Sequence, residues 1–474
     1  MTAETSDHLV KSSRRPPFFQ RVDWLAFGLA TFLSLVVYWF SLPPEIEFDD
    51  AGAYATTALY PGPSIPPGRP VWVLYGWLFM KLIPFSNVAW RLALSSAVAG
   101  AITCGLIALL VSRTGSFAFA DSPGFKNLTL REQKTAGLVC GIVAGLGFGF
   151  SSLFWSKAVR PDPYAFSLLL FAVTIILVTH WFFAPARKSS FALAFFTGSL
   201  AMVENADLWP VILGLWLLVV LAERKISRDV FLCVGIFLWW LIWQAHREYS
   251  PAISNLVFGY GPFIFIAATV AIALGGVFWW QTRKAFTEWK ILLLAGMMFL
   301  IGQCAHFLLP VYSMTTPPVN WGYPRTVEGF FHMTSRGTYC GPEVVYDPSE
   351  LASRTGLYFL QTGKDYGFIY MFMAAIATLC WWKTSSAARR WQAGLLLAWL
   401  FSSLQILMSM HGGMLIPGAE KSPACCAVTH LTLAIFSGLG LMHIVACCAK
   451  PMPDLTVKPA TAAGPQPNPV TTAI

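Results

Sequence analysis

Long apolar runs fill most of this 474-residue chain and leave little sequence for a soluble core. A helix that crosses a hydrocarbon core of about 30 Å needs roughly 20 apolar residues. Only 12% of the residues are charged, whereas soluble domains carry about 25%. We therefore predict an all-α polytopic membrane protein. Apolar runs of sufficient length lie near 23–42, 88–112, 136–154, 163–184, 229–246, 258–282, 290–312, 366–383, 391–410 and 428–449.

The stretch 190–222 is too long for one span and is interrupted by the polar string Glu204-Asn205-Ala206-Asp207. Two short spans with that turn at one surface account for it, which brings the predicted total to about twelve. The predicted membrane domain covers 23–449. A basic N-terminus, 1–22, precedes it, and a tail rich in Pro, Thr and Ala, 450–474, is expected to be disordered.

The apolar segment 71–85 decides the topology. If it lies along the membrane surface, most of the 32 Lys and Arg residues fall on one side, as the positive-inside tendency requires of the cytoplasmic face. We therefore predict an interfacial helix there. Both termini are then cytoplasmic, and the loops 43–87 and 313–365 share the outer face. The net charge of +9 sits mainly in short loops, so nucleic acid is not an expected partner.

Four glycines recur at every fourth position of the third apolar run. They are Gly137, Gly141, Gly145 and Gly149. Residues with this spacing share one face of a helix. A face of small residues lets a second helix approach closely. We predict a tight helix contact along it.

Most of the ten cysteines lie inside apolar runs and are expected to pack as small side chains. No Cys or His spacing indicates a metal site. Only Cys340, Cys425 and Cys426 fall on the predicted outer face, where disulfides persist. A bridge from Cys340 to one of the other two and three unpaired thiols are both open readings.

An acidic loop follows the first apolar run. It contains Glu45, Glu47, Asp49 and Asp50 without a basic residue among them. Carboxylates held near lipid are costly unless they have a function. This loop is therefore the best indication of chemistry in the chain.

Four short segments of this chain resemble sequence motifs of the GT-C glycosyltransferases. Within that superfamily, they are most similar to a bacterial membrane family related to protein O-mannosyltransferases. The first two strings are compared with the family's Asp-Ser-Gly-Glu and His-Pro-Pro-Gly-Tyr-Pro-Leu. The resemblance extends over nearly all of 23–449 and implies a GT-C-like bundle of about twelve transmembrane helices with interfacial helices on the outer face. The strings are Asp50-Ala51-Gly52-Ala53, Ile65-Pro66-Pro67-Gly68-Arg69-Pro70-Val71, Phe154-Trp155-Ser156 with Asp162-Pro163-Tyr164, and Asn320-Trp321-Gly322-Tyr323-Pro324-Arg325-Thr326.

The resemblance implies an inverting transfer of a sugar from a polyprenyl-phosphate carrier to a hydroxyl of a protein or glycan. Asp50, with Asp49 beside it, falls at the position of the general base. The alternative is that both residues cap the following helix. Asp162 would orient a substrate, or else pair with Arg160 across a turn.

Arg69, Arg91 and Arg325 are candidates for the carrier phosphate, because a guanidinium binds phosphate with two parallel hydrogen bonds. Arg69 stands where the family has an aromatic residue, so no family role transfers to it. For Arg91, at a span end, snorkelling is the favoured explanation. Asn320 and Trp321 would contact the sugar, although an interfacial belt also explains the tryptophan. The resemblance leaves open whether a divalent metal is a cofactor, since some GT-C enzymes use one.

Three positions depart from the family pattern. Ala53, Ile65 and Tyr312 stand where the family has Glu, His and Arg. Because of these three residues, an alternative is that the chain is a catalytically degenerate relative that acts as a scaffold. A lipid or solute transporter is a further alternative, but it predicts charged residues at mid-span and matched broken helices. The location implied by the resemblance is a bacterial inner (plasma) membrane.

Overall fold

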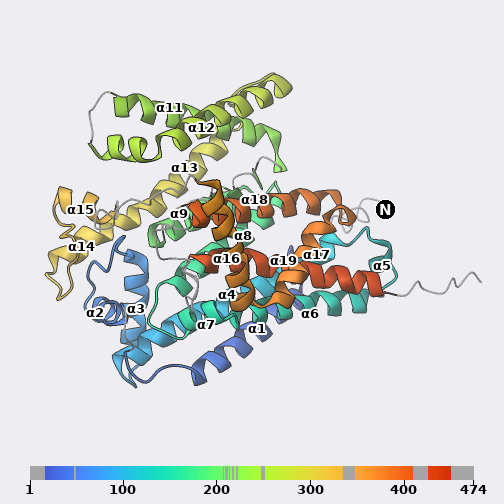
Figure 1. Ribbon diagram of the computed structural model, residues 1–474, viewed down its shortest axis with the longest axis horizontal. Coiled ribbons are helices and arrows are strands. Elements are labelled where there is room, and N and C mark those ends of the chain that lie inside the picture. Colours follow the sequence, from blue (N-terminus) through green and yellow to red (C-terminus); the bar gives the residue numbers. More distant parts are fainter. Residues whose placement is uncertain are drawn as a thin grey trace, which may run out of the picture.

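The computed structural model describes residues 17–46, 50–205, 208, 212, 214–215, 218–219, 222–246, 251–334, 347–408 and 425–449. Every regular element in these ranges is helical (Figure 1). Asp49, Cys340 and the tail 450–474 lie outside the described residues, and the expectations placed on them stay predictions.

The described helices form the following series in chain order. They are α1 (Arg21–Phe40), α2 (Ala51–Leu59), α3 (Pro70–Leu82), α4 (Val88–Ala118), α5 (Pro123–Lys126), α6 (Leu130–Gly149), α7 (Ser152–Ala158), α8 (Tyr164–Phe183), α9 (Lys188–Glu204), α11 (Arg224–His246), α12 (Pro251–Thr282), α13 (Trp289–Gln303), α14 (Leu308–Met314), α15 (Val327–Thr334), α16 (Pro348–Thr362), α17 (Phe368–Leu379), α18 (Ser386–Met408) and α19 (Cys426–Cys448).

Six helical segments in the described part of the chain are long and apolar enough to cross a membrane, or seven if the pair α6 and α7, bent by 73°, is one span. They make this a multi-pass membrane protein. The expected count of about twelve is not confirmed. Shorter helices explain part of the difference, because α9 ends after 17 residues and α17 has 12. The six are α1, α4, α8, α11 up to Gln244, α13 continued through α14, and α19.

The glycine face predicted in the third apolar run is confirmed. A Cβ added at Gly145 would lie 2.4 Å from the carbonyl oxygen of Cys104, and one added at Gly141 would lie 2.5 Å from that of Ala108. Real Cβ atoms do not approach backbone oxygen so closely. These glycines therefore let α6 pack directly against the backbone of α4.

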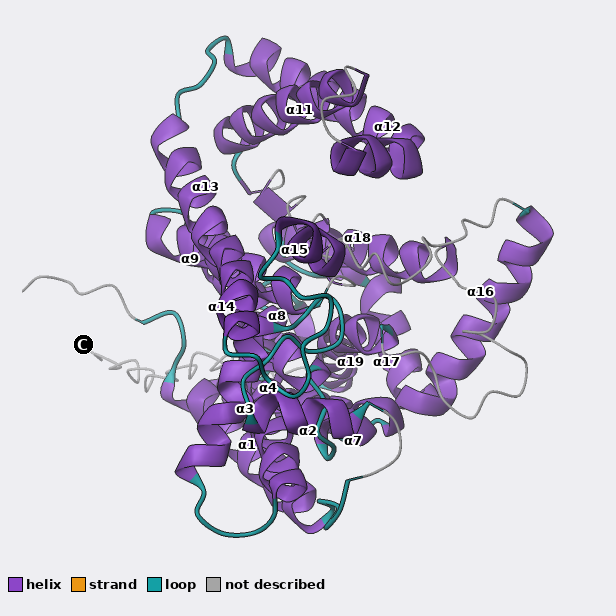
Figure 2. Cartoon of the chain, turned by 90° about the vertical axis from the view of Figure 1, so that its left-hand side faces the viewer, coloured by secondary structure: helices purple, strands orange, loops and turns teal. Residues whose placement is uncertain are grey.

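The bundle has two distinct ends. At the left of Figure 1 lie α2, α3, α14 and α15, which we call the α3 end. At the right lies α5, and we call this the α5 end. Figure 2 looks onto the α3 end and shows α2, α3, α14 and α15 gathered there. Helix α3 has 13 residues, about 20 Å in length, which is too short to cross; its interfacial position stays a prediction.

Helices α11 and α12 pack against each other and stand apart from the main bundle (Figures 1 and 2). A buried ion pair fixes the turn that leaves α12. Arg228 contacts Asp229 at 2.5 Å and donates to Thr282 at 2.7 Å. Asp229 accepts the backbone N–H groups of Phe286 and Glu288. Both charges are thus compensated by hydrogen bonds, which is what burial of an ion pair requires.

Candidate functional site

The two loops expected to share the outer face contact each other at the α3 end. The backbone N–H of Trp321 donates to the carbonyl of Pro63, with a nitrogen-to-oxygen distance of 3.5 Å. The Tyr312 hydroxyl donates to the carbonyl of Pro70 at 2.9 Å. Gly62 leaves no room for a Cβ against the carbonyl oxygen of Val319. The loop before α3 and the Asn-Trp-Gly string therefore form one surface.

Asp50 lies at the N-terminal boundary of α2 and is exposed. Its backbone carbonyl accepts the Tyr54 N–H at 3.0 Å, but its side chain makes no capping hydrogen bond to the helix. The capping explanation is therefore not supported for Asp50, and for Asp49 it lies outside the described residues. An exposed carboxylate at the end of the bundle is accessible to a substrate hydroxyl.

Arg69 is buried at the start of α3, in a left-handed backbone conformation with φ 48°. Its guanidinium carbon lies 5.2 Å from the ring centre of Tyr164 and 5.8 Å from that of Tyr54. Burial by itself lowers the pKa of Arg69, but Tyr54, Tyr164, Asp162 and Glu204 raise it, and the net pKa is above the ordinary value. The side chain is therefore a permanent cation between two aromatic rings.

Glu204 ends α9 and is fully buried. Its two carboxylate oxygens accept the backbone N–H groups of Val71 at 2.8 Å and Trp72 at 3.1 Å. These N–H groups belong to the first turn of α3, where a helix has no internal partners and favours negative charge. Burial raises the pKa of Glu204 to about 7, although both hydrogen bonds and Arg69 lower it. Glu204 thus anchors α3 and faces the buried cation.

Asp162 lies in the turn between α7 and α8, and its carboxylate uses both oxygens. One accepts the backbone N–H of Tyr164, the first residue of α8, at 2.8 Å. The other pairs with Lys157 at 2.8 Å. The sequence suggested Arg160 as the partner of Asp162, and the structure adds Lys157, five residues upstream, as a direct one. The Asp162 backbone is fixed by Ser96, which donates to its carbonyl and accepts its N–H.

The other predicted site residues lie outside this group of buried charges. Arg91 donates to the carbonyls of Ser86 and Met80 and closes the turn between α3 and α4. Asn320 exchanges hydrogen bonds with Ser313. Trp321 is 43% exposed, and Arg325 lies over the exposed ring of Tyr323. Arg69, Asp162 and Glu204 are therefore brought together, whereas Arg91 has a structural role in its turn.

The three departures from the family pattern meet in one apolar cluster. Ile65 and Tyr312 are buried in it with Tyr54 and Trp72, and Ala53 packs against it. In this chain the three positions thus take part in apolar packing. Two of the cluster's buried members, Trp72 and Val73, belong to the first turn of α3, directly after Arg69.

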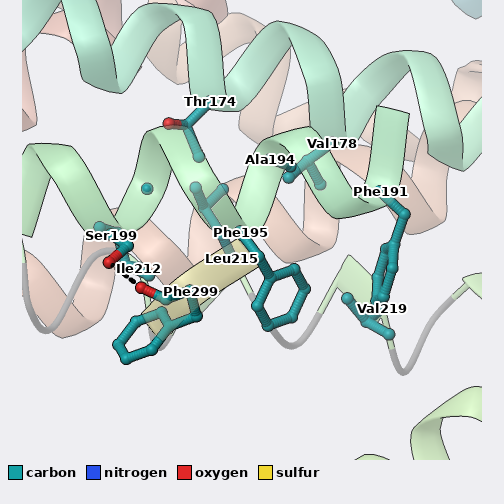
Figure 3. A pocket seen from close by; sticks show the side chains of 11 residues that line it. Thr174, Val178, Phe191, Ala194, Phe195, Ser199, Ile212, Leu215, Val219 and Phe299 are labelled. Atoms are coloured by element: carbon teal, nitrogen blue, oxygen red, sulfur yellow. Dashed lines mark hydrogen bonds between the residues drawn. The ribbon is translucent and has the colours of Figure 1, made fainter. Parts of the chain in front are cut away.

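Within the described ranges, no three His, Cys, Asp or Glu side chains gather as metal ligands. Figure 3 shows a small cavity between α8, α9 and α13, lined mainly by apolar side chains such as Val178 and Phe195. Its volume of about 20 Å³ holds at most a water molecule. The one hydroxyl drawn with a hydrogen bond there, Ser199, donates to the Phe299 carbonyl. This cavity is a packing void rather than a sugar site.

Two residues of the charge cluster were not among the predicted site residues. Glu204 was visible in the sequence as a polar interruption of an apolar run, which fits either a helix end or a site. Lys157 follows an aromatic string and has no distinguishing pattern of its own. Only the fold places both beside Arg69 and Asp162.

Residues 50–226 match the family model described as the protein O-mannosyl-transferase TMEM260 N-terminal domain. The chain is similar to protein O-mannosyl-transferase TMEM260 of Mus musculus, with 28% identity over 163 residues, which are 34% of this chain and 20% of that protein. It is also similar to protein O-mannosyl-transferase tmem260 of Dictyostelium discoideum, with 22% identity over 245 residues, 49% of this chain and 26% of that protein.

The matches thus span a fifth to about a quarter of the length of these curated relatives. No solved structure matches the chain. The matched segment 50–226 contains Asp50, Arg69, Asp162 and Glu204. The similarity supports an O-mannosyltransferase-like family and is concentrated on the part of the fold that holds the charge cluster.

Proposed function

We propose that this protein is a membrane glycosyltransferase that moves a mannosyl residue from a polyprenyl-phosphate carrier to a hydroxyl of a protein or glycan at the outer face. One observation carries the proposal. Arg69, Asp162 and Glu204 converge at the α3 end, near α2, whose first helical residue follows Asp50. This cluster lies inside the segment that is similar to protein O-mannosyltransferases.

In the proposed reaction the acceptor oxygen attacks the anomeric carbon from the face opposite the carrier phosphate. The new glycosidic bond forms as the bond to the phosphate oxygen breaks, so the configuration inverts. Asp50 takes the hydroxyl proton as general base. The polyprenyl phosphate leaves with the bonding electron pair.

The cations assist the departure of the phosphate. Arg69 is buried and acts as a fixed positive charge beneath the surface, where a low dielectric strengthens its field. Lys157 retains 21% side-chain exposure and is better placed to contact a phosphate directly. Asp162 holds Lys157 and the start of α8 in position. Arg325, exposed on the facing loop, is the second direct candidate.

The test uses the full chain in lipid nanodiscs with radiolabelled polyprenyl-phosphate mannose and a mixture of secreted proteins as acceptors. Wild-type protein should transfer label to protein. Asp50→Asn should lower the rate by about 10²–10⁴-fold, the usual effect of losing one general base. Glu45→Gln removes an exposed carboxylate of the same loop and should leave the rate unchanged.

Full activity in Asp50→Asn would remove the base assignment. Transfer of other labelled sugars but not mannose would change the donor and keep the chemistry. Thermal unfolding of each variant separates a lost base from a damaged fold.

A catalytically degenerate scaffold is the second candidate, and the cluster of Ala53, Ile65 and Tyr312 favours it. A scaffold with this cluster is folded but inactive toward every polyprenyl-linked donor. Restoring the ionisable residues as Ala53→Glu, Ile65→His and Tyr312→Arg would then be needed before any transfer is seen. Activity in the unmodified chain excludes this reading.

A further inference from the structure

A second charged region lies at the α5 end, on the opposite side of the bundle from the proposed site. A cavity of about 350 Å³ opens there between the segment before α1, the last turns of α4, and the loop that joins α8 to α9. This size is within the usual range for ligand pockets. Its walls are Phe18, Arg113, Phe183, Ala184, Pro185, Ala186 and Arg187.

Arg113 enters this cavity from α4 between aromatic rings. Its guanidinium carbon lies 4.3 Å from the ring centre of Phe117 and 5.4 Å from that of Phe18. The Arg113 Nε atom is buried and has no hydrogen-bond partner among the described residues. A buried donor without a partner is costly. Arg113 therefore has hydrogen-bonding capacity that a ligand can use.

Arg187 enters from the other side, at the start of α9. Its Nη1 atom lies 2.8 Å from His180 Nε2. Because a guanidinium only donates, His180 accepts through Nε2, and its Nδ1–H faces Ser190 Oγ at 2.8 Å. The contact fixes the position of Arg187 without neutralising its charge.

One carboxylate, Asp23, acts on Arg113 but does not line the cavity. Asp23 contributes favourable charge to Arg113. Its two oxygens, however, accept the Ser112 hydroxyl at 2.6 Å and the Gln20 N–H at 2.8 Å. No ion pair in the described part of the chain includes Arg113 or Arg187. The cavity thus carries net positive charge.

The aromatic side chains give the cavity an apolar wall. Phe18, Phe117 and Phe183 stack on one another with ring centres 5.2–6.3 Å apart. A site that joins two guanidinium groups to stacked phenyl rings fits an amphiphile whose charged group is a phosphate. Basic pockets between helices at one membrane face are known to receive anionic lipid headgroups.

We propose that this cavity binds the phosphate of an anionic phospholipid between Arg113 and Arg187, with the glycerol and upper acyl chain against Phe18 and Phe183. The site is separate from the proposed transferase site. It places a bound lipid where the segment before α1, the helices α4 and α8, and the loop to α9 meet, so the lipid fastens these four parts of the chain together.

The test reconstitutes the full chain in nanodiscs of phosphatidylcholine with a minority of phosphatidylglycerol. Native mass spectrometry after mild detergent release then counts the retained phosphatidylglycerol. Wild-type protein should retain it selectively. Arg187→Gln and Arg113→Gln should each weaken retention about tenfold or more, since hydrogen bonds to charged groups are strong. Arg131 is an exposed cation on α6 outside the cavity, and Arg131→Gln should retain as much phosphatidylglycerol as wild type.

A second arm separates a lipid headgroup from a free anion. Inorganic phosphate is added to protein in phosphatidylcholine alone, and thermal unfolding is followed. Stabilisation by phosphate equal to that by phosphatidylglycerol overturns the lipid assignment. Equal lipid retention by wild type and both variants overturns the site. Because Arg187 is exposed, its variant should fold as wild type, and unfolding in phosphatidylcholine checks this.

Discussion

Glu204, the last residue of α9, accepts the backbone N–H of Val71 at 2.8 Å across 133 positions of sequence. The same carboxylate accepts the next N–H along α3. One side chain thus joins the end of a predicted short span to the start of the predicted interfacial helix. The position of Arg69, immediately before α3, depends on this anchor.

Removing the anchor should loosen α3. In Glu204→Ala the N–H groups of Val71 and Trp72 lose their acceptors, and unsatisfied buried donors cost about 1–3 kcal/mol each. We expect a lower unfolding temperature in detergent and lower transferase activity. Glu328→Gln, at an exposed carboxylate of α15, is the matched control and should behave as wild type. Unchanged stability in Glu204→Ala would contradict the anchoring role.

The raised pKa of Glu204 makes stability depend on pH. Its folded-state pKa is about 7, against 4.5 for an ordinary Glu. A raised carboxyl pKa stabilises the fold fully below the lower value, and this contribution is lost as pH rises through the upper one. Relative to Glu204→Gln, the wild-type free energy of unfolding should fall from about pH 4.5 to about pH 7, by up to roughly 3 kcal/mol. If the free energies of unfolding of wild type and Glu204→Gln differ by a constant amount from pH 4.5 to pH 7, the pKa of Glu204 is not raised.

The contact between α4 and α6 should not tolerate a single methyl group. Gly145→Ala places a Cβ against the Cys104 carbonyl oxygen, and overpacking of this kind costs about 1–3 kcal/mol. Gly28→Ala in α1 meets nothing within 4 Å and gains helix propensity, so it should be neutral or stabilising by up to about 1 kcal/mol. Thermal unfolding of both variants measures the contrast. Equal effects at the two positions would argue against the close approach.

The predicted topology is tested by labelling intact cells that carry single-cysteine variants. Tyr60→Cys lies on the predicted outer face and Lys126→Cys on the inner face, and both side chains are exposed. A membrane-impermeant reagent should label the first and not the second. Labelling of position 126 from outside would place α3 across the membrane and invert every later loop.

The proposed tether between the outer loops involves Cys340, which lies outside the described residues. Cys425 and Cys426 stand at the start of α19, and Cys426 is buried. If Cys340 bridges to one of them, alkylation without reductant should leave two of the three thiols unmodified. Peptide mass analysis with and without reductant identifies the pair. Complete alkylation of all three without reductant excludes the bridge.

The local pattern of the sequence was sufficient for the helical class, the first spans and the glycine face. Apolar run length fixes α1, α4, α8 and α19, because hydrocarbon thickness sets that length. The spacing of Gly141 and Gly145 predicted a tight contact, because residues four apart share a helix face. The pattern did not identify α4 as the partner helix, since packing choice involves distant segments.

Tertiary structure alone decided the charge cluster. The sequence has both Lys157 and Arg160 shortly before Asp162 and suggested Arg160 as its partner, whereas the structure pairs Lys157 with this carboxylate. Nothing local to Glu204 indicates that α3 begins beside it, or that Ile65 and Tyr312 share one apolar cluster. Sequence spacing predicts which residues share a helix face, but hydrogen bonds and charges act over a few ångströms in space. Residues more than a hundred positions apart therefore become partners only once the bundle has packed.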